Sequence, residues 1–409
     1  MSSIQTMRGV AFAPRETVRL ALIGCGGRGR GMLRELLACP EVQVVAVYDV
    51  SDEAAQKAAN VIREKGKTEP KIIVGGDVRQ VLDPNTTDLA YIATPWPQHV
   101  PYAVAAMEAG LHAAVEVPAA VTLAECWAMV ETSERTRRHC IQLENCCYGD
   151  NELMMVHLAR TGKLGTLTHG EAAYIHDLRH LLLSDQSEGL WRREPHKNSD
   201  GNFYPTHGLG PVAQAMGIHR GDRFTRLISM SSREASLTET RNAIIEDGNP
   251  KRSELYKAGD MNTSLIQTAK GRTIMLQHDV VTPRPYSRGT LLQGSKGAFR
   301  DWPAGVFLEA DPKTPHHGGW ADIATIKEEF EHPLWKELRE KVKELGSGHG
   351  GMDFVMNWRL VQCLHEGLVP DMDVYDAAAW SAPGPLSEDS VRLGNMPVEF
   401  PDFTRGHWE

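Results

Sequence analysis

Short apolar runs alternate with amphipathic stretches between residues 18 and 143. Each run has the length of a strand, and the stretches between them carry apolar residues at three-to-four spacing, as one-sided buried helices do. This alternation predicts an α/β fold with a doubly wound parallel sheet. The predicted strands are 18–23, 42–48, 71–74, 88–93, 112–116 and 140–143.

The pattern changes after about residue 150. Strand-like segments follow one another with turn residues between them, and Gly294–Gly297 reads as a hairpin turn. We therefore expect a second α+β domain with an open antiparallel sheet and C-terminal helices that pack back on the first domain. The expected strands are 167–175, 226–234, 263–269, 272–281, 289–293 and 305–309, and the expected helices are 152–161, 324–345, 352–366 and 373–380.

These patterns divide the chain into three parts. Residues 1–17 have no periodicity and are expected to be a flexible N-terminal segment. Residues 18–149 form the doubly wound domain, and residues 150–409 form the substrate-binding and catalytic domain. Because ligands of such sheets bind outside the carboxyl ends of the strands, residues 94–99 and 116–118 are expected beside the bound ligand.

A glycine-rich turn joins the first predicted strand to a helix. Gly24 permits the tight turn, Gly26 lets a pyrophosphate approach the backbone, and Gly29 allows close helix packing. Asp49 ends the second strand, where it would accept hydrogen bonds from a ribose diol and repel a 2′-phosphate. The pattern predicts a Rossmann-type domain that binds NAD rather than NADP, through Gly24, Gly26, Gly27, Arg28, Gly29 and Asp49.

Composition narrows the class of protein. The 409 residues include 41% hydrophobic and 24% charged residues, which is typical of a globular protein with two cores. The net charge of −9 argues against nucleic acid as a partner, and no apolar run is long enough for a membrane span. Residues 1–17 carry no apolar core of signal-peptide length and no twin arginine, so we expect a cytoplasmic protein. Seven scattered cysteines predict reduced thiols. No cysteine and histidine spacing predicts a metal site.

The order of the domains resembles the glucose–fructose oxidoreductase and inositol dehydrogenase superfamily. Members commonly carry Glu-Lys-Pro after the fifth strand, where the lysine assists hydride transfer, but here Val117 replaces the lysine. Members also often carry an aspartate four residues before a histidine, whereas here Phe203 precedes His207. Both departures argue against a plain sugar dehydrogenase.

Several longer motifs resemble a narrower group, the NAD-dependent α-N-acetylgalactosaminidases of glycoside hydrolase family 109. The resemblance spans roughly residues 18–400. The motifs are Glu116–Ala120, Leu143–Tyr148, His169–Asp177, Tyr204–Pro211, Pro283–Tyr286 and Gly348–Asp353.

The resemblance implies a hydrolysis that passes through a redox cycle. NAD would oxidise the sugar at C3, the acidified C2 proton would leave, the C1 substituent would be eliminated, water would add, and the ketone would be reduced again. No net oxidation results, so the cofactor would stay bound. Such a cycle needs a proton acceptor at the C3 hydroxyl, a base at C2 and an acid at the glycosidic oxygen.

Tyrosine and histidine side chains in the motifs are the candidates for these roles. Tyr174 and His176 are two apart on a predicted strand and so project from one face. With His207 they are the acid/base candidates, and His349, on a glycine-rich loop, is a fourth. The expected substrate-binding residues are Glu144, Tyr174, Arg192, Arg193, Tyr204, Pro205, Thr206, His207 and Tyr286. Further expected cofactor-binding residues are Trp96, His99, Glu116, Val117 and Asn145.

Other interpretations stay open at this point. A net NAD-dependent sugar or cyclitol dehydrogenase is the alternative enzyme, and a non-catalytic cofactor-binding regulator is a third class. Individually, Trp96 and His99 could cap a strand-to-helix turn, and His349 could lie in a plain glycine linker. The sequence leaves open the exact sugar, its anomer, the aglycone and whether the chain forms a homo-oligomer.

Overall fold

The computed structural model describes residues 5–309, 311–314 and 319–409, and it contains two compact units. The first unit extends to Gly149 and also includes Pro333–Ala378, while the second comprises Asp150–His332 and Ala379–Glu409. The packing groups residues 333–378 with the first unit, in line with the expectation that C-terminal helices pack back on the first domain, although the predicted domain of 150–409 included them.

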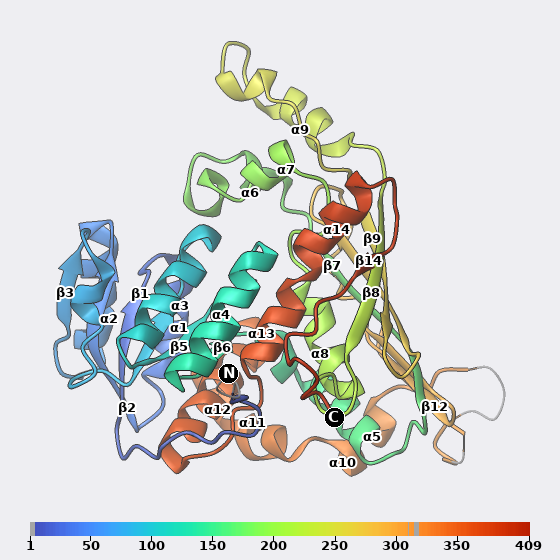
Figure 1. Cartoon of the computed structure of the whole chain (residues 1–409), viewed down its shortest axis with the longest axis horizontal. Helices are drawn as coiled ribbons and strands as arrows, with labels where there is room; N and C mark the ends of the chain where they lie inside the picture. Colours follow the sequence, from blue (N-terminus) through green and yellow to red (C-terminus); the bar gives the residue numbers. More distant parts are fainter. Residues whose placement is uncertain (1–4, 310, 315–318) are drawn as a thin grey trace. The chain divides into compact units, whose positions relative to one another are not determined.

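A six-stranded parallel sheet forms the centre of the first unit, as the sequence predicts (Figure 1). Its strand order is β3-β2-β1-β4-β5-β6, so the winding reverses between β1 and β4. Ligands of doubly wound sheets bind outside the carboxyl ends at this switch point. The strands are β1 Val18–Ile23, β2 Val42–Asp49, β3 Lys71–Val74, β4 Leu89–Ile92, β5 His112–Val115 and β6 Cys140–Gln142.

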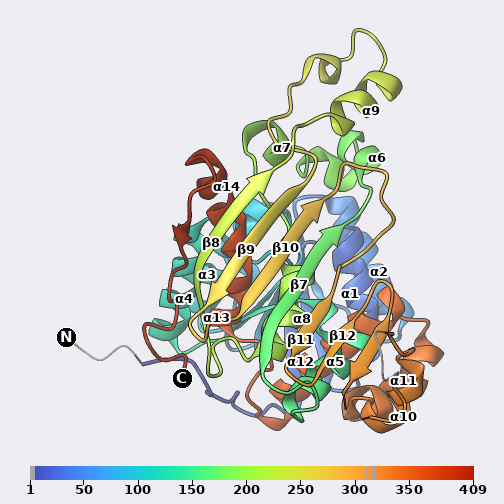
Figure 2. The same ribbon diagram turned by 90° about the vertical axis from the view of Figure 1, so that its right-hand side faces the viewer.

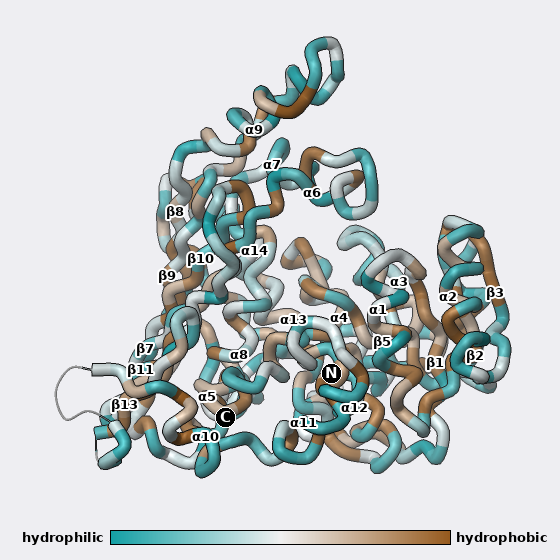
Figure 3. The backbone as a smooth tube through the Cα atoms, turned by 180° about the vertical axis from the view of Figure 1, so that it is seen from behind, coloured by the Kyte–Doolittle hydropathy of each residue, from teal (hydrophilic) through white to brown (hydrophobic). Residues whose placement is uncertain are grey.

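Two helices of the first unit begin at side-chain caps that the sequence shows. Thr122 and Glu125 form a capping box at the start of α4, and Ser51 caps α2. Central strands such as β1 are buried and appear as brown apolar segments in Figure 3. The helices are α1 Gly27–Leu36, α2 Asp52–Glu64, α3 His99–Glu108, α4 Leu123–Thr136, α11 Pro333–Leu345 and α12 Met352–Glu366, with 3₁₀ turns η1 Val78–Val81, η2 Trp96–Gln98, η3 Asn145–Tyr148 and η6 His349–Gly351.

The N-terminal segment is packed where the sequence led us to expect flexibility. Met7 and Phe12 are buried. The Phe12 ring lies 4.8 Å from the His112 ring and 4.3 Å from the His139 ring, both in the first unit. The expectation of a flexible segment is therefore wrong for this part, because two apolar side chains anchor it.

An open eight-stranded sheet forms the second unit, with the order β13-β12-β11-β7-β10-β9-β8-β14 (Figure 2). The expected open sheet is confirmed, but it is mixed, because β7 and β10 pair in parallel. Its strands are β7 Leu167–Ile175, β8 Phe224–Ser231, β9 Asn262–Thr268, β10 Thr273–Asp279, β11 Leu291–Gly294, β12 Gly297–Arg300, β13 Gly305–Leu308 and β14 Val398–Glu399.

Helix α8 covers one face of this sheet at β7. A Cβ on Gly208 would lie 2.4 Å from the Ala173 nitrogen, and one on Gly170 would lie 2.6 Å from Val212. Glycine at both positions therefore allows the close approach. The opposite face leaves Met230 and Leu265 exposed. The helices of this unit are α5 Asp150–Arg160, α6 Arg179–Leu183, α7 Glu194–Asn198, α8 Thr206–Met216, α9 Ser236–Ile244, α10 Ala324–Phe330 and α14 Pro383–Arg392, with 3₁₀ turns η4 Ser187–Leu190 and η5 Pro250–Ser253; α13 Val374–Ser381 spans the boundary between the units.

Proline accounts for two differences from the predicted helices. The single helix expected over 324–345 is two, α10 and α11, because Pro333 starts a new helix. Pro383 likewise starts α14, which the periodicity did not reveal. Within the described residues, no helix combines the length and apolar character needed to cross a membrane.

Candidate active site

The glycine turn has the shape that a dinucleotide requires. Gly24 has φ +93°, and a Cβ there would lie 2.5 Å from the Ala93 carbonyl oxygen. A Cβ on Gly29 would lie 1.9 Å from the Gly24 oxygen, whereas one on Gly26 or Gly27 would meet no atom within 4 Å. The turn is thus closed where helix and strand meet and open where a pyrophosphate approaches.

Asp49 is held beside this turn at the end of β2. Its carboxylate accepts hydrogen bonds from the Cys25 N–H at 2.6 Å and the Ser51 N–H at 2.8 Å. A fixed carboxylate next to the glycine turn is the group that recognises a ribose diol. The open glycines and this acid fit NAD.

A buried ionic network adjoins the turn. Arg28 donates from Nε to Glu116 at 2.5 Å and from Nη1 to both oxygens of Asp353 at 3.1 Å. Asn145 donates to the same Asp353 at 2.8 Å. Burial alone would lower the pKa of Arg28, but the two carboxylates outweigh it and raise that pKa above its usual value. Arg28 therefore stays charged.

His349 joins the same network from η6. Its Nδ1 lies 2.7 Å from Asp353 Oδ2. This hydrogen bond outweighs burial and raises the pKa of His349. Burial favours a neutral Asp353, but the His349 hydrogen bond and the Arg28 charge lower the pKa of Asp353 to about 2. Sequence reasoning missed Asp353, although its position four residues after His349 was a usable signal.

His99 does not offer a free ring nitrogen to a cofactor. Its Nδ1 lies 2.8 Å from the Pro118 carbonyl oxygen and its Nε2 lies 2.8 Å from that of Thr94. The ring thus joins the loops after β4 and β5, as the turn-capping alternative expects, and a cofactor contact of His99 stays a prediction. Trp96 and Val117 are buried in these same loops.

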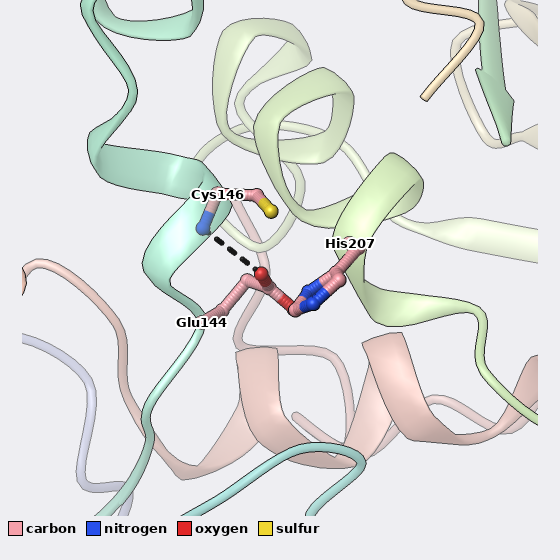
Figure 4. Close-up of side chains that lie close together, drawn as sticks. All are labelled: Glu144, Cys146 and His207. Atoms are coloured by element: carbon pink, nitrogen blue, oxygen red, sulfur yellow. Dashed lines mark hydrogen bonds between the residues drawn. The ribbon is translucent and has the colours of Figure 1, made fainter. Parts of the chain in front are cut away.

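Glu144 is buried at the start of η3. Its Oε1 accepts a hydrogen bond of 3.1 Å from the backbone N–H of Cys146 (Figure 4). This contact caps the 3₁₀ turn and fixes the carboxylate beyond the end of β6. A substrate role for Glu144 stays a prediction.

In the second unit, Tyr174 and His176 form a hydrogen-bonded pair. The Tyr174 hydroxyl lies 2.9 Å from Nδ1 of His176, as expected for residues on one face of a strand end. Burial, together with the charges of Arg192 and His207, lowers the pKa of His176. The imidazole is therefore neutral near pH 7 and can exchange a proton with the phenol.

Aromatic rings surround Tyr174. Ring centroids of Tyr204, His207 and Tyr286 lie 4.6, 5.4 and 6.2 Å from that of Tyr174. Pro205 precedes α8, Thr206 is its buried first residue, and His207 projects from its first turn (Figure 4). The close contact of Gly208 with β7 is what brings this turn next to Tyr174.

The two neighbouring arginines have different environments. The Arg192 guanidinium lies over the Tyr204 ring at 4.7 Å and pairs with Glu188 at 2.5 Å. Arg193 donates to the Leu182 and Gly189 carbonyls and to Glu254. These partners hold Arg193 within its own loop, so its expected substrate role stays a prediction, while Arg192 lies against the aromatic rings around Tyr174.

His278 is a buried residue beside Tyr174, and sequence reasoning missed it. It pairs with Tyr174 in the β7–β10 register, and the two rings stack at 6.3 Å. Burial, with His196 and Arg192 nearby, lowers the pKa of His278 well below its usual value. The parallel pairing that places it there had no signal in the sequence pattern.

Comparison with known families separates the two parts of the chain. Residues 18–143 match the oxidoreductase family with an NAD-binding Rossmann fold, and residues 148–409 match the glycosyl hydrolase 109 C-terminal domain. The chain belongs to glycosyl hydrolase family 109. This membership makes it an NAD-dependent glycoside hydrolase, as the sequence analysis predicted.

Two curated relatives align with this family 109 chain along its whole length. A glycosyl hydrolase family 109 protein of Solibacter usitatus is 51% identical over 411 residues, which cover 100% of this chain and 93% of that protein. The α-N-acetylgalactosaminidase of Shewanella oneidensis is 42% identical over 412 residues, covering 100% and 90%.

Solved structures show the same fold at low identity. A levoglucosan dehydrogenase in complex with NADH and levoglucosan has TM-score 0.72 and 18% identity, covering 94% of this family 109 chain and 100% of that protein. An oxidoreductase domain protein from Kribbella flavida has TM-score 0.73 and 18% identity, covering 95% and 100%. These neighbours support the fold only.

Proposed function

We propose that the chain hydrolyses glycosides of terminal N-acetylgalactosamine by an oxidation, elimination, water addition and reduction sequence. The Shewanella oneidensis relative, which aligns along the full chain, is an α-N-acetylgalactosaminidase, and this supports the sugar. NAD, when bound, supplies the means to take a hydride from the sugar and to return it. The glycine turn, Asp49 and Arg28 would hold it.

The Tyr174 and His176 pair carries the proposal. A base of the reaction must take a weakly acidic proton near neutral pH. Tyr174 Oη would take that proton and pass its own to Nδ1 of the neutral His176. The Arg192 guanidinium, 6.0 Å from the Tyr174 ring, would stabilise the negative charge that develops on the phenol.

The residues around Tyr174 would donate a proton to the leaving group or orient the sugar. His207, in the first turn of α8, would give a proton to the glycosidic oxygen as it leaves. Tyr204, Tyr286 and Arg192 would orient sugar hydroxyl and acetamido groups, because they present phenol and guanidinium donors around Tyr174. Glu144 and Asn145 keep their expected substrate and cofactor roles as part of this proposal.

The test is nitrophenol release from 4-nitrophenyl α-N-acetylgalactosaminide by the purified full chain, with NADH absorbance followed in parallel. Release without lasting NADH supports the proposal. NADH growth without release would instead mean a net dehydrogenase, and cofactor binding without turnover on any glycoside of either anomer would favour a regulator. His207→Ala should abolish release, whereas His180→Ala, an exposed histidine of the same unit, should not.

The cysteines support a reducing compartment for this activity. All seven are buried thiols outside any disulfide, which fits the expectation of a cytoplasmic enzyme. Fractionation of the native host checks it, and recovery of the protein outside the cytoplasm would contradict it.

A further inference from the structure

The loop that carries His349 is docked on the helix that follows the glycine turn. The Gly348 N–H donates to Glu35 of α1 at 3.2 Å, and α1 and α12 pack together. Gly350 and Gly351 have φ of +66° and +100°, and His349 itself has φ +50°. Such left-handed backbone is costly for histidine and persists where surrounding contacts hold it. The loop is therefore a built part of the first unit.

Four charged groups of the first unit lie around His349 or its loop. They are Asp353 of α12, Arg28 and Glu35 of α1, and Glu116 at the end of β5. Asp353 joins the imidazole directly to Arg28, which lies inside the glycine turn. The His349 side chain is 61% exposed, so a ligand at this edge can reach it.

We infer that His349 is a binding residue for the dinucleotide, and that its protonated ring favours the negatively charged diphosphate of NAD. Without it, Arg28 is paired with the two carboxylates of Glu116 and Asp353, and protonation of His349 adds a second positive charge to this group. This assignment replaces the proton-transfer role expected for His349. It uses the NAD site of the first unit and does not depend on the sugar that the enzyme hydrolyses.

A direct test is the dissociation constant of NAD for the full chain, measured by equilibrium dialysis at pH 6 and pH 9 after removal of bound nucleotide. The wild-type constant should rise about threefold to fivefold between these values, the size of one partly exposed charge interaction. The His349→Gln variant should have a higher dissociation constant than wild type, and this constant should be the same at pH 6 and pH 9. His365→Gln, on the far end of α12, is the matched control and should behave as the wild type.

Asp353→Asn separates a charge effect from a structural one. Without the carboxylate, the midpoint of the pH dependence should move down toward about 6.5, the ordinary value for histidine. The inference is overturned if His349→Gln binds NAD like the wild type at both pH values. Because dialysis needs no glycoside, failure of the proposed sugar specificity would leave this result unaffected.

Discussion

The Tyr174 hydroxyl and Nδ1 of His176 lie 2.9 Å apart at the end of β7, and the two residues are two positions apart along the chain. The strand geometry places both on one face, and α8 brings His207 to the same phenol. A phenol hydrogen-bonded to a neutral imidazole can exchange a proton with it near neutral pH without a pair of carboxylates. This arrangement leads to the first two predictions.

Removing the Tyr174 hydroxyl should abolish proton transfer while leaving the fold intact. Tyr174→Phe is expected to lower kcat by about 10²- to 10⁴-fold, the range for loss of a positioned acid or base. NAD affinity and the melting temperature should stay near wild type. Tyr256→Phe is the control, because Tyr256 bonds Glu254 elsewhere in the same unit. Equal effects of both substitutions on kcat would contradict the role.

The acid limb of the pH profile should report His176. The pKa of His176 is lowered, so kcat/KM should fall only below pH 6.5, where the imidazole becomes protonated and can no longer accept a proton. Arg192→Gln removes a nearby cation and should move this limb to higher pH, besides raising KM. Kinetics of wild type and variant across pH 4–9 check the direction, and an unmoved limb would exclude His176 as the titrating group.

Two glycines on one helix give a matched test of the cofactor turn. Gly29→Ala should prevent NAD binding, because its Cβ would lie 1.9 Å from the Gly24 carbonyl oxygen. Gly31→Ala should be tolerated, since no atom lies within 4 Å of its Cβ, and it should favour the helix slightly. Nucleotide binding and melting curves distinguish the two, and similar behaviour of both variants would argue against the close packing.

Buried histidines should make the first unit sensitive to acid. Burial and the neighbouring His139 lower the pKa of His112 to about 3, and its Nδ1 accepts a hydrogen bond from the His139 N–H at 3.0 Å. The unfolded state therefore binds the proton first. The free energy of unfolding should fall as pH drops below about 6.5, by up to about 1.4 kcal/mol per pH unit, until the pH nears 3.

His112→Asn tests this linkage. The amide oxygen can replace Nδ1 as acceptor but cannot titrate, so the loss of stability between pH 7 and pH 5 should become smaller. Lost contact with Phe12 should lower stability at pH 7 by about 1–2 kcal/mol. Urea unfolding at both pH values measures this, with His180→Asn as the exposed control. An unchanged slope in His112→Asn would assign the acid sensitivity elsewhere.

Local patterns predicted the parts of the site that lie close together in the chain. The strand, the glycine turn and Asp49 follow one another with the spacing of a dinucleotide turn, and the turn has the predicted packing at Gly24 and Gly29. The pair of Tyr174 and His176 also needs only the twofold repeat of a strand. Each of these features depends on steric contacts within a short stretch of chain, so the order of residues in that stretch predicts it.

Long-range packing decided the rest. The sequence could not distinguish Arg192 from Arg193, because their partners, Glu188 and Glu254, are selected by the fold. The contact of Asp353 with Arg28 spans 325 positions, and the stacking of His278 on Tyr174 depends on the parallel register of β7 and β10. The sequence by itself determined the family, the cofactor and the local turns. Only the tertiary structure decided which charges meet, since a side chain's partner depends on contacts whose sequence separation no periodicity encodes.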